Sequence, residues 1–195
     1  MTKAEKTKAF IIEKTAPIFN KKGFAGTSLN DMTAATGLTK GSIYGNFANK
    51  DEVALAVFDY NLKKLTDIIN SDLSQQKGAR NKLLVYAEQY EKFLHPPFTE
   101  GGCPVLNTAV EADDTHAGLR TKATEAILSW KKTIVQIIEQ GIKNKEFKPD
   151  TNAEQIAFTM IAMTEGSMMI AKLLDNKQYV TMVLQSMRKM IECID

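Results

Sequence analysis

A cluster of polar side chains between residues 39 and 46 has the chemistry of a binding surface. Its members are Thr39, Lys40, Ser42, Tyr44 and Asn46. All of them can donate hydrogen bonds, and such donors bind the phosphate oxygens and base edges of nucleic acids. Ile43 and Phe47 lie among them at a spacing of four residues, which places both apolar side chains on one helix face.

Two short helical patterns meet at Gly37 and position this cluster. The first pattern covers about residues 28–35 and points Met32 inward, and the second covers about residues 40–47, with Thr39 able to cap its start. Two short helices joined by a glycine turn have the layout of a helix-turn-helix, in which the second helix enters a DNA groove. The sequence therefore predicts a DNA-binding element here.

Each polar residue can be given a role on this hypothesis. Lys40, Gly41 and Ser42 lie at the start of the second helix, where Lys40 could donate to guanine and Gly41 allows close approach. Asn46 could bind phosphate or adenine. The residues expected to bind mainly the phosphate backbone are Thr27, Ser28, Tyr44 and Lys50. The alternatives are that Thr27 and Ser28 only cap a helix and that Tyr44 only packs.

The charge distribution agrees with binding to a polyanion. Residues 1–50 carry eight lysines and three acidic residues, a formal charge of +5, while the whole chain has +2. The remainder is therefore mildly acidic. A basic end on an acidic body favours contact with nucleic acid, and a solvated lysine-rich helix is the alternative.

Length and composition are those of a globular protein of one or two domains. The chain has 195 residues and two cysteines, Cys103 and Cys193, which do not form a disulfide framework. The N-terminus is charged and lacks the apolar core of a signal peptide, and no uncharged run exceeds ten residues. We expect a cytoplasmic protein with free thiols and no membrane partner.

Hydrophobic periodicity predicts an all-α chain of about nine helices, with no strand candidate. The expected helices cover residues 2–22, 28–35, 40–47, 49–73, 79–94, 104–112, 117–145, 152–174 and 177–193. Pro17 lies inside the first pattern and predicts a local irregularity. The expected domain boundary follows residue 49, giving domains of residues 1–49 and 50–195.

Residues 23–53 resemble the TetR family of bacterial transcriptional regulators. The matching positions are Gly23, Phe24, Thr27, Ser28, Leu29, Met32, Gly37, Leu38, Thr39, Lys40, Gly41, Ser42, Ile43, Tyr44, Phe47, Lys50 and Val53. The resemblance implies an N-terminal three-helix DNA-binding domain and a C-terminal six-helix domain for ligand binding and dimerisation. It also implies a repressor released from its operator by a small molecule. A two-fold dimer reads two half-sites and so predicts a palindromic operator, and no cofactor is expected. Gly45 and Asn46 depart from the family pattern and leave the bases that are read open.

The last two helices are the expected homodimer interface. They contain seven of the nine methionines together with small residues such as Ala162 and Gly166 that allow close packing. The alternative is that these methionines fill the core. An effector pocket is expected between helices of the larger domain. Its candidate residues, each of which could instead belong to the core, are Tyr90, Phe98, Cys103, Asn107, Trp130 and Met163.

Cys103 suggests a second kind of regulation. It follows Gly101 and Gly102 and precedes a helix, whose dipole would favour the thiolate, so a redox or electrophile sensor is the alternative function. An enzyme is not expected, because Cys103 and His116 lack any catalytic signature. The cysteines and histidines also lack the spacing of zinc ligands, and no metal is expected.

Overall fold

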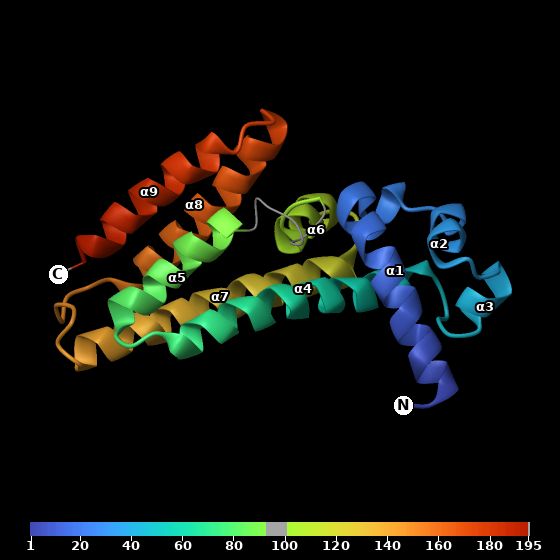
Figure 1. The fold of residues 1–195 in the computed structure, drawn as a ribbon, viewed down its shortest axis with the longest axis horizontal. Coiled ribbons are helices and arrows are strands. Elements are labelled where there is room, and N and C mark those ends of the chain that lie inside the picture. The colour runs from blue at the N-terminus through green and yellow to red at the C-terminus, as the bar shows by residue number, and fades with distance from the viewer. Residues whose placement is uncertain (93–100, 195) are drawn as a thin grey trace. The chain divides into compact units, whose positions relative to one another are not determined.

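The computed structural model describes residues 1–92 and 101–194, which form nine helices and no strand (Figure 1). The helices are α1 (Lys3–Gly26), α2 (Leu29–Thr36), α3 (Lys40–Tyr44), α4 (Lys50–Gln75), α5 (Ala79–Lys92), α6 (Pro104–Ala112), α7 (Ala117–Lys143), α8 (Ala153–Leu173) and α9 (Gln178–Glu192). The predicted all-α fold is confirmed. Phe98, one of the predicted pocket residues, lies outside the described residues.

The helices form two compact units. The head unit contains residues 1–65 and 101–124, and the body unit contains residues 66–92 and 125–194. α6 and the first part of α4 therefore pack with the DNA-binding helices, although they follow the predicted boundary at residue 49. That boundary stays a prediction, since it rests on the local pattern alone.

The long helix α1 is interrupted near its end. Its backbone leaves the helical region only at Gly23, with φ 72° and ψ −178°, a left-handed φ that suits glycine. One further helical turn follows before Thr27. The irregularity predicted at Pro17 is wrong, because the helix passes through that residue with helical dihedral angles.

The two helices of the predicted helix-turn-helix cross around a small buried core. Met32 and Ile43 are completely buried and Phe47 is 2% exposed. Gly37 ends α2 in the left-handed conformation, with φ 67°. The apolar spacing and the turn glycine thus have the roles predicted for them.

The second of these helices is shorter than predicted. α3 ends at Tyr44, and Gly45 is its C-cap instead of an interior position. The side-chain amide of Asn46 donates to the carbonyl oxygen of Ser42 at 2.9 Å and so satisfies one of the last carbonyls of the helix. The helix ends early because this side chain replaces the next backbone donor.

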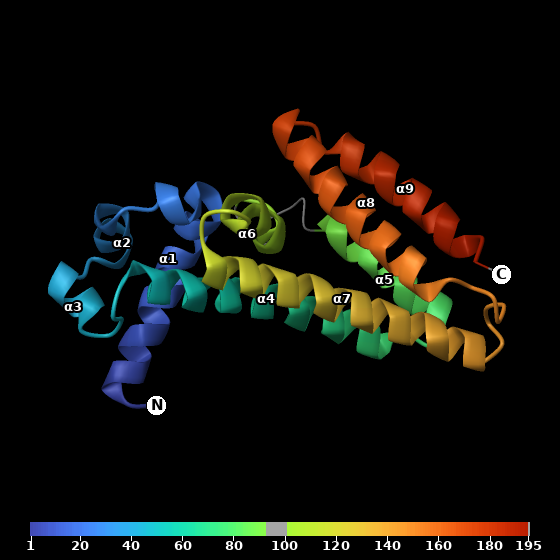
Figure 2. The same ribbon diagram turned by 180° about the vertical axis from the view of Figure 1, so that it is seen from behind.

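In the body unit, α9 lies beside α8 in both views and also packs against α5 (Figures 1 and 2). Val180, Leu184 and Met187 form the buried face of α9. Arg80 of α5 donates to the backbone carbonyls of Ile191, Glu192 and Ile194 at distances of 2.5, 2.8 and 2.6 Å. This cation holds the C-terminal end of α9 in place.

By length and composition alone, α8 is long and apolar enough to cross a membrane, which the short uncharged runs did not suggest. A core helix passes the same test. Thr164, Glu165 and Ser167 are buried polar residues within α8, and Tyr90 donates to Glu165 at 2.8 Å. These polar groups belong to the face of α8 that packs within the body unit.

Candidate nucleic-acid interface

The start of α3 presents donors on an exposed surface. The hydroxyl of Thr39 accepts a hydrogen bond from the Ser42 amide at 3.2 Å and caps the helix. Lys40 and Gly41 are exposed, and the Lys40 ammonium forms no ion pair or hydrogen bond within the part of the chain that the structure describes. Ser42 and Tyr44 are half-buried beside them. The arrangement leaves a positive charge and several donors available to an incoming phosphate or base edge.

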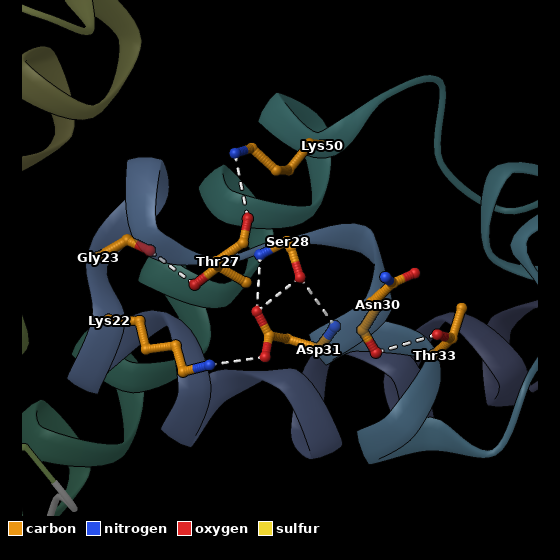
Figure 3. Close-up of polar contacts among 8 residues, drawn as sticks. All are labelled: Lys22, Gly23, Thr27, Ser28, Asn30, Asp31, Thr33 and Lys50. Atoms are coloured by element: carbon orange, nitrogen blue, oxygen red, sulfur yellow. Dashed lines mark hydrogen bonds and ion pairs between the residues drawn. The ribbon is translucent and has the colours of Figure 1, made fainter.

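Ser28 caps α2 as part of a reciprocal pair with Asp31 (Figure 3). The Ser28 hydroxyl accepts from the Asp31 amide at 3.1 Å, and the Asp31 carboxylate accepts from the Ser28 amide at 2.8 Å. Lys22 approaches the same carboxylate at 2.6 Å. Lys22, together with the Ser28 donors, holds the pKa of Asp31 well below its usual range. Ser28 therefore has the capping role, and its phosphate contact stays a prediction.

Thr27 has a structural role within the head unit. Its side chain is completely buried, and its hydroxyl donates to the carbonyl oxygen of Gly23 at 2.6 Å (Figure 3). Thr27 stabilises the break in α1 through this bond, and its contact with DNA stays a prediction beside that structural role.

Lys50 points toward the end of α1. Its ammonium donates to the carbonyl oxygen of Thr27 at 3.1 Å (Figure 3). It also donates to the carbonyl oxygen of Phe24 at 2.9 Å and lies 4.2 Å from the centre of the Phe24 ring. Two of its three donors are thus used inside the head unit. The third can serve a phosphate, so the predicted clamp stays a prediction beside a structural role.

Asn46 has less freedom than the sequence suggested. One N–H of its amide is committed to Ser42, which leaves the second N–H and the amide oxygen for a two-bond contact with adenine. Its second N–H is the group that can still approach a phosphate.

Several residues of the head unit were missed by the sequence interpretation. Glu111 of α6 accepts from the backbone amides of Phe24 at 2.7 Å and Ala25 at 2.8 Å. Lys8 of α1 forms a 2.7 Å ion pair with Glu52 of α4. Partners 87 residues apart, as Glu111 and Phe24 are, leave no local pattern by which they could be found.

The predicted effector residues fall in both units. Cys103 and Asn107 belong to the head unit, while Tyr90, Trp130 and Met163 belong to the body unit. Cys103 is only 5% exposed. The amide of Asn107 donates to the carbonyls of Gly101 at 2.9 Å and Asn20 at 3.0 Å, so this residue holds a loop in place.

Each unit contains a cavity or groove lined by described residues. The head unit contains one of about 30 Å³, lined by residues such as Asn61, Asn107 and Glu111, which has room for about one water molecule. The body unit contains a groove of about 280 Å³ at the start of α5, beside α7. Of the predicted effector residues, only Asn107 lines either cavity.

Known proteins resemble this chain over both units. The sequence profile for bacterial regulatory proteins of the tetR family matches residues 11–57. The profile for a tetracyclin repressor-like C-terminal domain matches residues 79–187. The first match contains the helix-turn-helix, and the second covers most of the described body unit.

Two solved structures and a named repressor agree with both profiles. A TetR-family transcriptional regulator from Cytophaga hutchinsonii is 50% identical, with a TM-score of 0.96 over 100% of this chain and 98% of its own. A TetR transcriptional regulator from Chloroflexus aurantiacus J-10-FL is 34% identical, with a TM-score of 0.94 over 99% of this chain and 98% of its own. The HTH-type transcriptional repressor DhaR of Mycobacterium sp. (strain GP1) is 24% identical over 181 residues, which are 91% of this chain and 90% of the repressor. This chain belongs to the TetR family of DNA-binding transcriptional regulators.

Proposed function

We propose that this regulator is a repressor that binds a palindromic operator as a homodimer and leaves it when a small molecule binds the body unit. The observation that supports DNA recognition is the exposed start of α3, where Lys40 lies beside the Thr39 cap without a partner among the described residues. A single helix-turn-helix reads too few base pairs to be specific, and a two-fold dimer reads two half-sites. The proposed contacts are Ser28, Thr39, Lys40, Gly41, Ser42, Tyr44, Asn46 and Lys50.

Replacing Lys40 tests this assignment. Lys40→Ala should weaken binding to the operator by at least tenfold and make the dependence of binding on salt concentration less steep by about one released counterion per half-site. Fluorescence anisotropy with a labelled duplex at several salt concentrations measures both. Lys132→Ala removes an exposed lysine of α7 in the body unit and serves as the control. Unchanged affinity and salt dependence in Lys40→Ala would show that α3 does not contact DNA.

The face of α8 and α9 supports the proposed dimer. Met160 and Met187 are buried, as the core alternative required, but Met169 and Met182 are 47% and 61% exposed. Other large apolar side chains are exposed beside them: Phe158, Ile170, Leu173 and Leu174. A Cβ built at Gly166 would meet nothing within 4 Å, so a second helix can approach closely there. We propose that a second copy of this chain covers this face.

We place the effector site in the body unit, where Tyr90, Trp130 and Met163 lie. Trp130 is the only tryptophan of the chain, so a change in its fluorescence on addition of a candidate effector tests this placement. The thiol-sensing alternative receives no support, because Cys103 is buried and a sensor thiol must be accessible. The family consists of transcriptional regulators, and we assign no catalytic role. We propose that the protein acts in the cytoplasm, where bacterial DNA lies.

A further inference from the structure

The backbone joint between α1 and α2, residues 23–27, is held from two sides by charged side chains. The Glu111 carboxylate of α6 accepts from the amides of Phe24 and Ala25 at 2.7 and 2.8 Å. The Lys50 ammonium of α4 donates to the carbonyl of Phe24 at 2.9 Å and to that of Thr27 at 3.1 Å, the second of which Figure 3 shows. Phe24 therefore has both its backbone N–H and its C=O in charge-assisted hydrogen bonds to side chains of other helices.

The break at Gly23 creates the need for Glu111. With φ at 72°, the chain leaves α1 and starts a new helical turn, whose first amides have no partner within the helix. The Glu111 carboxylate fills that position, and a Cβ at residue 23 would overlap it. A carboxylate is favoured there because the first amides of a helical turn carry partial positive charge.

α6 is also fixed to α1 near its own start, so Glu111 is part of a rigid attachment. The amide of Asn20 donates to the carbonyl of Gly102 at 2.9 Å, and Asn107 donates back to the carbonyl of Asn20 at 3.0 Å. These contacts lie at one end of α6 and the Glu111 bonds lie near the other. α6 therefore holds the end of α1 at two separate points.

We propose that Glu111 is a positioning residue for operator binding, which with Lys50 sets the direction in which the helix-turn-helix leaves α1. Ser28, the cap of α2, follows Thr27 directly, so the direction of α2 and α3 depends on this joint. The inference rests on the proposed function, because a dimer on a palindrome must hold its two recognition helices at one spacing. A loosened joint lets the helices fit other spacings and weakens the discrimination between them.

The test compares Glu111→Gln and Glu111→Ala with Asp114→Asn. Asp114 is exposed just beyond α6 and its removal makes the same charge change without touching the joint. The probes are the palindromic duplex that the wild-type protein selects from a random double-stranded DNA pool and the same duplex with one base pair added at its centre. We expect both Glu111 variants to bind the selected duplex about tenfold more weakly, the effect of losing a hydrogen bond to a charged group. Their affinity for the lengthened duplex should change much less, so the ratio of the two affinities falls toward one.

Unchanged affinity of Glu111→Gln for both duplexes would overturn the proposal. An equal loss of affinity for both duplexes would also overturn it, because the ratio then keeps its wild-type value and the role of Glu111 is merely structural. Thermal unfolding and hydrogen exchange at the Phe24 and Ala25 amides accompany the binding data, and faster exchange confined to residues 23–28 is the supporting result. If Glu111→Ala does not fold, Glu111→Gln carries the test, since it keeps one acceptor and the side-chain shape. Failure of the wild-type protein to select any palindrome would overturn the proposed function itself, before any variant is compared.

Discussion

Asp31 is a residue at which one charge ties the helix-turn-helix to α1. Its carboxylate accepts hydrogen bonds from the Lys22 ammonium and from the amide and hydroxyl of Ser28. These contacts keep the pKa of Asp31 well below the ordinary value of 3.8. A carboxyl with a depressed folded-state pKa adds stability above its unfolded pKa, and this stability is lost as the pH falls through the folded pKa. Asp31→Asn should therefore unfold at a lower temperature than the wild-type protein at pH 7, and this difference should shrink progressively below about pH 4.

Thermal unfolding followed by circular dichroism between pH 2 and pH 7 measures this effect. Asp150→Asn is a suitable control, because Asp150 is exposed and forms no ion pair in the part of the chain that the structure describes. A difference in melting temperature that stays constant over the whole pH range would contradict the linkage argument.

Residue roles were predictable where they depend on neighbours in the sequence. Ile43 and Phe47 are buried as their spacing required, and Thr39 caps α3 as its position required. The burial of Thr27 could not be predicted, because it depends on how the chain leaves α1 and not on the residue type. Glu111 gave no signal, since its partners Phe24 and Ala25 are in a different part of the sequence.

At the scale of elements, α3 depends on packing for its existence. A helix of five residues is not stable in water by itself, so the buried side chains around it supply its stability. Phe47 is 2% exposed, and Lys8 of α1 lies over its ring at 4.7 Å. Phe47→Ala should destabilise the head unit by about 3–5 kcal/mol, the usual cost of emptying such a site.

Urea unfolding followed by circular dichroism checks this value, and loss of operator binding should accompany it. Phe10→Ala removes the same ring from a 38% exposed position of α1 and should cost about 1 kcal/mol or less. Similar losses in both variants would mean that Phe47 does not form the core of the helix-turn-helix.

Helix positions were largely predictable from periodicity and capping residues. α6 was expected at residues 104–112 and found at Pro104–Ala112, because Pro104 suits the first position of a helix. α3 was expected to reach residue 47 but ends at Tyr44, since Asn46 bonds back to Ser42. A helix end that depends on a single side-chain contact cannot be predicted from the apolar pattern.

For the whole molecule, the exposed face of α8 and α9 predicts the oligomeric state. Leu173 is 76% exposed in the single chain, and a carboxylate in its place would be buried without a partner if a second copy covers this face. Leu173→Glu should therefore sediment at half the mass of the wild-type protein and should bind the two-half-site operator at least tenfold more weakly.

Leu128→Glu is the matched control. Leu128 is 50% exposed on α7, outside the proposed interface, and its replacement should leave both the mass and the operator affinity unchanged. A dimeric Leu173→Glu protein would place the interface elsewhere on the chain.

The organisation into units was less predictable than the helices. Residues 101–124 pack with the head because of contacts such as Glu111 with Phe24 and Asn107 with Asn20, each separated by 87 residues. The location of the effector site could not be predicted from helical periodicity either, because a pocket is formed by several packed helices. Family membership, by contrast, could be predicted from residues 23–53, because the many positions that match the family pattern lie close together in that stretch of sequence.

The contact of Arg80 with the end of α9 has a consequence for the length of the chain. All three acceptors are backbone carbonyls, at Ile191, Glu192 and Ile194, so no side-chain replacement at these positions removes them. Among changes to this segment, only a shorter chain removes these carbonyls. A chain that ends at residue 190 would lack all three acceptors of the Arg80 guanidinium. The protein should therefore tolerate C-terminal truncation only up to a point within residues 191–194. That point is set by Arg80, more than a hundred residues earlier in the sequence.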